Sequence, residues 1–335
     1  MDRVLVTGAN GHVGWNLVQL LVEKGYSVRA AVRNRNDSAK TKPLASLGVE
    51  LVEADLLKPD TLDSAVKQMD GVFQVAAVYT TFAKNPQKEI IEPSVTGGIN
   101  VLEAAKKGGV KKVVFTSSVA AVGTVEKGGA PRTEADWNER AIDPYTFAKT
   151  EAEKRAWEFS RNSGLSMVSI LPSAVIGPGF YRHTPSTQMF ELLLRGKVPF
   201  ILPMSLGFVD VRDVARAHVL AYENPRAEGR YICSAWFASV KEVFQIIYKL
   251  DPAIKVPTLR LPAGLMGVLP ALDWMGNKLM GLPRFMTKDF VREYGGRELH
   301  CSSDKIRREL GWQPLEFEQS LKDTLDWIRG TFLPH

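Results

Sequence analysis

The chain of 335 residues predicts an α/β fold with a doubly wound parallel sheet and a smaller C-terminal lobe. Three observations predict it. A short apolar run followed by a glycine-rich turn opens the chain, apolar runs then alternate with amphipathic segments, and this rhythm breaks after residue 179. A hydrophobic content of 45% is enough for a full core in a chain of this length.

The alternation predicts six parallel strands in the first half, because each run is short, apolar and separated from the next by a helical pattern. Helices are expected between them, for example over 61–69 and 97–107. The expected strands are 4–6, 27–32, 49–53, 71–75, 113–116 and 166–171.

A helix followed by prolines is expected within 180–203, and a returning strand over 230–233. This change of rhythm indicates that a second structural unit is inserted and then resumed. We therefore predict a Rossmann-type dinucleotide-binding domain over 1–176 with 207–236, and a substrate-binding lobe over 177–206 with 237–335.

The first strand runs into a turn with the spacing Gly-x-x-Gly-x-x-Gly, from Gly8 through Gly11 to Gly14. The first glycine permits the tight turn, the second lets the backbone approach a pyrophosphate, and the third allows close packing of helix on strand. The helix that follows presents free amides and the positive end of its dipole to phosphates. A dinucleotide site is favoured over a purely structural loop, with expected contacts from Gly8, Asn10, Gly11, His12, Val13 and Gly14.

Tyr145 and Lys149 are four residues apart, which places them on one face of a helix. The pKa of a phenol is about 10 in isolation, and a neighbouring ammonium lowers that pKa toward the working range. A serine hydroxyl from 116–118 can then hold a substrate carbonyl while the phenol protonates its oxygen. The same spacing is common on solvated helix faces, so the pair has weight only together with the glycine turn.

The end of the second strand predicts the choice of cofactor. An acidic residue there binds the ribose 2′-hydroxyl of NAD, but this chain has Arg33. A guanidinium pairs bidentately with a phosphate and stacks on adenine. The alternative interpretation is an exposed arginine at a strand end, and Asp37, farther along, is expected to face solvent. We predict NADP(H).

Together with Ser118, Tyr145 and Lys149, the glycine spacing resembles that of the extended short-chain dehydrogenase/reductase family. Within this family the chain is most similar to dihydroflavonol 4-reductase-like and related aldehyde or ketone reductases. Similar segments cover nearly the whole chain, including 31–33, 53–56, 72–77, 98–104, 171–178, 208–215, 229–233 and 303–312. Gln74 departs from the subgroup pattern, in which plant reductases often carry histidine, and this bears on a flavonoid substrate rather than on the mechanism.

The resemblance implies carbonyl reduction, or its reverse, with hydride transfer from nicotinamide C4. Tyr145 then donates a proton to the oxygen, Ser118 hydrogen-bonds that oxygen, and Lys149 lowers the tyrosine pKa and holds the ribose hydroxyls. Ser117 is the alternative catalytic serine. Further cofactor contacts are expected from Asp55, Leu56, Ala76, Ala77, Tyr145, Lys149, Pro172, Ser173 and Val175.

An apolar or aromatic substrate pocket is expected from residues that are equally compatible with an ordinary core. With Ser118, these are Tyr79, Phe82, Trp137, Phe180, Tyr181, Met189 and Phe208. The substrate is expected to be a small carbonyl compound or alcohol. The family offers two arrangements, a homodimer through the helices after Val95 and Tyr145, or a monomer.

Composition excludes several other classes. The formal charge of +6 has no basic run interleaved with aromatics, so nucleic acid is not expected as a partner. Cys233 and Cys301 form no disulfide framework, and the five histidines form no ligand cluster, so neither disulfides nor a metal is expected. The chain enters a strand at once, which leaves no room for a signal peptide and favours a cytoplasmic location.

The segment 261–283 is apolar but interrupted by proline and charge, and it falls short of a membrane span of about 20 residues. A helical hairpin over the substrate pocket is the preferred interpretation, and an interfacial membrane contact is the alternative.

Three other functions stay open at this point. A sugar-nucleotide epimerase or dehydratase uses the same triad on the same fold, usually with tightly bound NAD, against which Arg33 argues. A hydroxysteroid dehydrogenase-like enzyme is a second alternative. A regulator that binds NADP(H) without catalysis is a third, and the intact triad argues against it.

Overall fold

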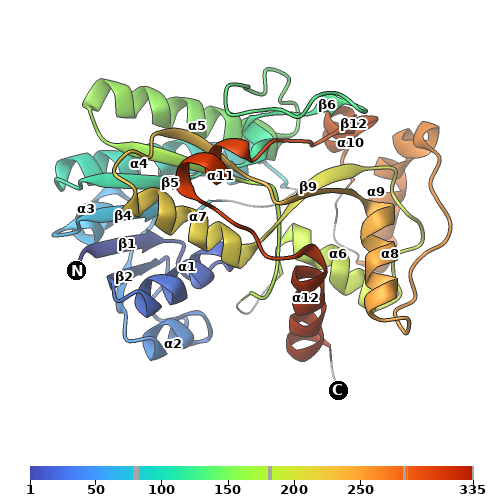
Figure 1. Ribbon diagram of the computed structural model, residues 1–335, viewed down its shortest axis with the longest axis horizontal. Helices are drawn as coiled ribbons and strands as arrows, with labels where there is room; N and C mark the ends of the chain where they lie inside the picture. The colour runs from blue at the N-terminus through green and yellow to red at the C-terminus, as the bar shows by residue number, and fades with distance from the viewer. Residues whose placement is uncertain (78–82, 180–182, 282–283, 285, 334–335) are drawn as a thin grey trace.

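A seven-stranded parallel sheet forms the centre of the computed structural model, which describes residues 1–77, 83–179, 183–281, 284 and 286–333 (Figure 1). The strand order is β10-β7-β5-β4-β1-β2-β3. The chain therefore starts inside the sheet, adds β2 and β3 on one side of β1, and adds the later strands, from β4 on, on the other side. The strands are β1 (Arg3–Thr7), β2 (Ser27–Val32), β3 (Glu50–Glu53), β4 (Gly71–Gln74), β5 (Lys112–Thr116), β7 (Met167–Pro172) and β10 (Gly229–Cys233). The predicted doubly wound Rossmann-type sheet is confirmed.

Helices cover both faces of this sheet because each has one apolar stripe. On one face, α1 (His12–Glu23), α2 (Ser38–Ser46), α7 (Val211–Glu223) and α11 (Asp304–Leu310) share a buried apolar cluster with β1 and β2. On the other lie α3 (Pro59–Val66), α4 (Glu92–Lys107), which continues from the π-helical turn η1 (Gln87–Ile91), and α5 (Pro144–Ser163).

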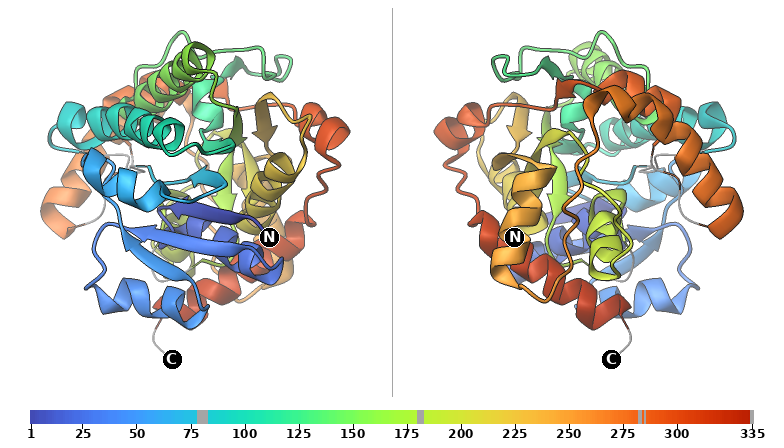
Figure 2. Two further views of the ribbon diagram at one scale, coloured as in Figure 1. Left: turned by 90° about the vertical axis from the view of Figure 1, so that its left-hand side faces the viewer. Right: turned by 90° about the vertical axis from the view of Figure 1, so that its right-hand side faces the viewer.

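A second sheet of three strands lies beside the carboxyl end of β7. It consists of β8 (Ala174–Ile176), β9 (Ser205–Asp210) and β11 (Trp236–Ser239), with β9 parallel to β8 and antiparallel to β11. A third apolar cluster joins it to α6 (Pro185–Leu194), α8 (Val240–Leu250) and α12 (Phe317–Phe332). Figure 2 shows these helices gathered on the side opposite the N-terminal strands. β8 and β9 therefore lie outside the seven-stranded sheet, and the division into two domains stays a prediction.

The described residues form six further helices and strands. They are η2 (Val119–Ala121), η3 (Ala263–Val268), α9 (Leu269–Met280), α10 (Lys288–Tyr294) and a small antiparallel pair, β6 (Val125–Glu126) with β12 (Arg297–Glu298).

The helix expected over 97–107 begins five residues earlier, at Glu92, and two other expected helical elements also differ from the structure. The helix expected over 61–69 runs from Pro59 to Val66, because proline suits a first helical turn and Gln68 has a positive φ of 62°. The hairpin expected over 261–283 is a single helical run, since η3 passes into α9 through residues with helical backbone angles. Among the described helices, none combines the length and apolar character needed to cross a membrane.

Candidate active site

The glycine-rich turn joins β1 to α1 with no room for side chains. Gly8 has φ +64°, and a Cβ on it would lie 2.8 Å from the Cα of Ala76. A Cβ on Gly14 would lie 2.1 Å from the carbonyl oxygen of Gly8. The start of α1 is therefore held against the end of β1, and its first amides lie at the carboxyl edge of the sheet.

The loop after β4 is held against this turn by buried polar side chains. The Thr7 hydroxyl accepts hydrogen bonds from the backbone N–H groups of Val75 at 3.0 Å and Ala76 at 3.1 Å. The Gln74 amide donates to the carbonyl of Ala76 at 3.0 Å, and its side chain is buried. Gln74 thus shapes the loop at the predicted cofactor contact Ala76, with Ala77 exposed beside it.

The ring of His12 points toward α12 and the chain after β8. Its Nε2 lies 3.1 Å from the carbonyl oxygen of Gly177, and the ring stacks on Trp327 with a centroid distance of 5.8 Å. Burial lowers the pKa of His12 to about 4, so the ring is neutral at pH 7. Any contact of His12 with a phosphate would therefore come from its backbone amide.

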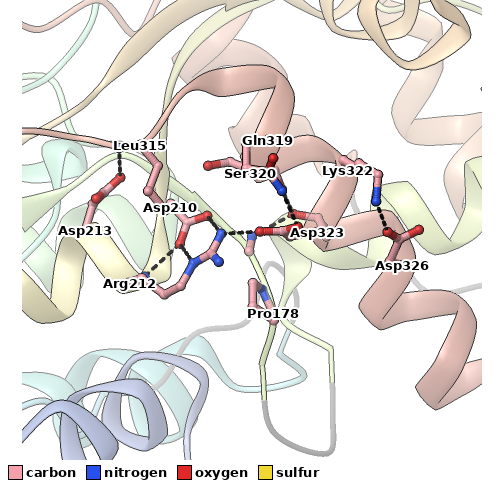
Figure 3. Close-up of polar contacts among 12 residues, drawn as sticks. Pro178, Asp210, Arg212, Asp213, Leu315, Gln319, Ser320, Lys322, Asp323 and Asp326 are labelled. Atoms are coloured by element: carbon pink, nitrogen blue, oxygen red, sulfur yellow. Dashed lines mark hydrogen bonds and ion pairs between the residues drawn. The ribbon is translucent and has the colours of Figure 1, made fainter. Parts of the chain in front are cut away.

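An ion-pair cluster joins α12 to the start of α7 (Figure 3). Asp210 is buried and caps α7, accepting from the backbone N–H of Arg212 at 2.8 Å. The guanidinium of Arg212 bridges Asp210 and Asp323 of α12, at 2.8 Å to each carboxylate. A Cβ on Gly177 would lie 2.9 Å from the Asp210 carboxylate, so the chain after β8 passes directly over this cluster.

The expected adenine end of the site is more open. Arg33 is exposed directly after β2. The Asp55 carboxylate accepts from the backbone N–H of Leu57 at 3.0 Å, and Leu56 packs against Gly97 of α4. Arg33 is thus accessible to a 2′-phosphate, and residues 55–57 form a shaped turn beside it.

Three more of the residues predicted to contact the cofactor lie at the end of β7 and in β8. Pro172 ends β7, and Val175 lies half-buried in β8. Between them, the buried hydroxyl of Ser173 has no hydrogen-bond partner among the described residues. This unsatisfied hydroxyl and the side-chain-free glycine cradle are the features that a bound dinucleotide would use.

The predicted catalytic residues lie on α5 and directly after β5. Lys149 is buried in α5 and donates to the Thr116 carbonyl at 3.2 Å, two residues before Ser118. Ser118 caps η2, with its hydroxyl accepting from the N–H of Ala120 at 3.2 Å, and η2 packs against α5. Tyr145 lies one turn before Lys149 on the same face of α5. The structure therefore brings the three predicted residues to one edge of the sheet.

Burial lowers the pKa of Lys149 to about 8, and the nearby Glu153 carboxylate raises it in part. More than half of the Lys149 side chains are therefore neutral above that pH. The charge that is expected to act on Tyr145 depends on what surrounds Lys149.

Glu153 is the first residue of the site that sequence analysis missed. Its fully buried carboxylate pairs with Arg230 of β10 at 2.9 Å and accepts from the Ser117 hydroxyl at 2.7 Å. Arg230 also donates to two backbone carbonyls and stacks on Trp137 at 3.7 Å. The Ser117 hydroxyl is therefore engaged by Glu153, and Trp137 lies in the same network.

The second missed group holds the start of α5. Asp143 caps the helix, accepting from the N–H groups of Tyr145 at 3.1 Å and Thr146 at 3.3 Å. Glu293 of α10 accepts from the N–H groups of Ile142 at 2.6 Å and Asp143 at 3.3 Å. The dipeptide Asp143-Pro144 is a helix-start signal that sequence reasoning could have used, whereas nothing local points to Glu293.

The predicted substrate residues give a mixed result. Tyr79, Phe82, Phe180 and Tyr181 lie outside the described residues. Phe208 is 2% exposed and packs against Phe317 with a centroid distance of 5.6 Å, and Met189 packs against the same cluster. The structure therefore supports the core interpretation for Phe208, and the substrate pocket stays a prediction. Among the described residues no cluster of metal-ligating side chains is found.

A parallel sheet with a glycine cradle at its carboxyl edge defines a dinucleotide-binding α/β protein. The chain belongs to the NAD dependent epimerase/dehydratase family, whose family model matches residues 4–233, and the expected membership of the extended short-chain dehydrogenases/reductases is confirmed.

Two curated relatives are reductases. Cinnamoyl-CoA reductase CAD2 from Medicago truncatula is 37% identical, over 76% of this chain and 82% of its own length. Dihydroflavonol 4-reductase from Callistephus chinensis is 34% identical, over 98% of this chain and 94% of its own length.

Solved structures share the fold along the whole chain. The crystal structure of gox2253 matches with a TM-score of 0.86 and 28% identity, covering 100% of both chains. Gre2 of Candida albicans, solved in complex with NADPH, matches with a TM-score of 0.78 and 26% identity, covering 99% of this chain and 100% of its own.

Proposed function

We propose that this protein is an NADPH-dependent oxidoreductase that reduces a ketone or aldehyde to an alcohol, or catalyses the reverse reaction. The observation that carries the proposal is the hydrogen bond from Lys149 to the Thr116 carbonyl at the end of β5. Tyr145 precedes Lys149 by one turn of α5, and Ser118 follows Thr116 by two residues. The relatives named as reductases, and the neighbour solved with NADPH, support both the reaction class and the cofactor.

Bound NADPH would supply the hydride. Tyr145 donates a proton to the carbonyl oxygen, and Ser118 hydrogen-bonds the same oxygen as negative charge develops on it. Lys149 favours the phenolate through its charge, and its position within the site suits it to hold the nicotinamide ribose. Gly8, Gly11 and Gly14 let the start of α1 approach the pyrophosphate, and Arg33 binds the 2′-phosphate.

The substrate class follows from the relatives and from the expected pocket. Cinnamoyl and dihydroflavonol groups are aromatic, so a small apolar or aromatic carbonyl compound is the proposed substrate. A panel of ketones, aldehydes, flavanonols and hydroxysteroids, screened for NADPH oxidation, identifies it. A homodimer through α4 and α5 stays a prediction.

Tyr145→Phe tests the mechanism, because it keeps the ring and removes the proposed proton donor. We expect kcat to fall by roughly 10²–10⁴-fold with NADPH affinity unchanged, measured by fluorescence titration. Ser118→Ala should lower mainly kcat as well. Tyr248→Phe, at an exposed tyrosine of α8, is the matched control. A Tyr145→Phe enzyme with near wild-type kcat would remove tyrosine from the mechanism.

Arg33→Asp tests the cofactor. Loss of the phosphate contact and added repulsion should reduce the preference for NADPH over NADH by several-fold to a hundredfold, or about 1–3 kcal/mol. Equal kcat/KM with both cofactors in wild type and variant would contradict the assignment. The epimerase alternative, which the family description keeps open, predicts instead that the purified protein carries tightly bound oxidised NAD.

A further inference from the structure

We propose that η3 and α9 form an apolar, basic surface that docks the protein on an anionic lipid bilayer. This surface, the 259–279 patch, lies at the edge of the molecule on the side opposite the N-terminal strands (Figure 1). The orange segment that includes α9 is also peripheral in both views of Figure 2.

Large apolar side chains are concentrated in this patch. Among the described residues, fourteen large hydrophobic side chains are exposed, and seven of them lie within 259–279. Monomeric soluble proteins normally scatter such side chains singly, and a contiguous group marks an interaction site. The seven are Leu259, Leu265, Val268, Leu272, Trp274, Met275 and Leu279.

The exposed residues follow the period of a helix. From Leu265 through Val268, Leu272 and Met275 to Leu279, the spacing alternates between three and four, which aligns them along one side of the run. In contrast, Met266 and Leu269 are buried and anchor the opposite side of the run to the protein. The outward side is therefore apolar while the helix is already packed, which is the arrangement of a helix that lies in a membrane interface.

The positive charge around the 259–279 patch favours an anionic partner. Residues 255–292 contain six lysines and arginines and two aspartates, a net charge of +4 out of +6 for the whole chain. Both aspartates are paired within this segment, Asp273 with Arg284 at 2.9 Å and Asp289 with Arg292 at 3.4 Å. The remaining basic residues, Lys255, Arg260, Lys278 and Lys288, are exposed.

Trp274 and Lys278 complete the interfacial pattern. The Lys278 ammonium lies 5.0 Å from the ring centroid of Trp274, and both side chains are exposed. Tryptophan and lysine are the residues that anchor helices at the level of lipid headgroups. A second copy of this chain would bring the same positive charge against itself, whereas an anionic bilayer complements it.

Vesicle co-sedimentation of the full chain tests the proposal. We expect binding to phosphatidylcholine vesicles that contain phosphatidylserine, at least several-fold weaker binding to phosphatidylcholine alone, and loss of binding as salt screens the charges. Leu272→Asp should reduce binding to the anionic vesicles by about tenfold or more, because it places a charge on the buried face of the contact.

Leu57→Asp is the matched control. Leu57 is 46% exposed and Leu272 is 48% exposed, and both substitutions add the same charge, but Leu57 lies near β3. Thermal unfolding of both variants establishes that the fold is retained. Trp274→Phe should remove most of the fluorescence change that anionic vesicles cause.

Three results would overturn the proposal. The first is equal vesicle binding by Leu272→Asp, Leu57→Asp and wild type. The second is no vesicle binding together with a concentration-dependent dimer that Leu272→Asp abolishes, which would assign the patch to a second copy. The third is no vesicle binding together with a raised KM of the Leu272→Asp variant for an accepted substrate, which would assign the 259–279 patch to covering the substrate pocket. The first two readouts do not depend on whether the proposed reaction is correct, whereas the third requires an accepted substrate.

Discussion

Two buried carboxylates lie on α5, one on each side of the Tyr145–Lys149 pair, and they have opposite surroundings. Glu153 is paired with Arg230 at 2.9 Å and hydrogen-bonded by Ser117. Asp143 accepts from two backbone amides but faces the carboxylate of Glu293, and burial together with that charge raises its pKa to about 6.

The comparison shows that burial alone does not determine how an acid acts in a site. Glu153 has a counter-charge in Arg230 and a hydroxyl donor in Ser117, so it joins β10 and the end of β5 to α5. Asp143 has only dipolar partners and a like-charged neighbour, so its charge changes near neutral pH. The start of α5 is therefore expected to respond to pH.

Breaking the ion pair should have the largest effect. Glu153→Gln leaves the Arg230 guanidinium buried without its counter-charge, and we expect about 3–5 kcal/mol of lost unfolding free energy in urea denaturation. Glu158→Gln, at an exposed glutamate of the same helix, should change it by less than about 0.5 kcal/mol. A Glu153→Gln protein as stable as the control would show that the pair contributes nothing to stability.

Removing the cap should have a smaller effect. Asp143→Ala deletes the acceptor for Tyr145 and Thr146, and we expect a loss of about 0.5–2 kcal/mol of stability. The variant should also lower kcat, because the first turn of α5 carries Tyr145. Ser239→Ala removes the cap of α8 and should lose similar stability with kcat unchanged. If both variants kept full activity, the cap would not position the tyrosine.

The smallest effect is the pH dependence of Asp143. Since its folded pKa of about 6 lies above the value of 3.8 for an ordinary aspartate carboxyl, protonation favours the folded state. Its contribution is therefore fully present at low pH and is lost as pH rises through 6. Between pH 5 and 7 we expect wild type to lose about 1 kcal/mol of unfolding free energy relative to Asp143→Asn.

The subtraction of Asp143→Asn is needed because other groups titrate in the opposite direction. Burial lowers the pKa of His12 and His218 to about 4, so their contribution is lost as pH falls. Parallel curves for wild type and Asp143→Asn over this range would mean that Asp143 does not titrate there.

Local patterns explain which parts of this site were predictable. Gly8 to Gly14 lie in one short stretch after an apolar run, and Tyr145 and Lys149 share a helix face, so the two patterns together indicated candidate roles. The strand runs were predictable for the same reason, because a doubly wound sheet buries each strand on both faces.

Partners that are distant in sequence were not predictable. Nothing near Glu153 points to Arg230, and nothing near Ile142 points to Glu293, because β10 and α10 reach α5 only in the folded chain. The period of the lobe helices identifies their apolar faces, but it does not distinguish a core phenylalanine such as Phe208 from one that lines a pocket.

The contact between His12 and Trp327 has a consequence for biosynthesis. His12 stands in the first helix and Trp327 in the last, so the floor of the glycine turn is completed by almost the final residues to be made. At about 5–20 residues per second, the ribosome leaves the His12 ring without this cover for roughly 15 to 60 seconds. Chains truncated before α12 are therefore expected to leave the His12 ring without its stacking partner.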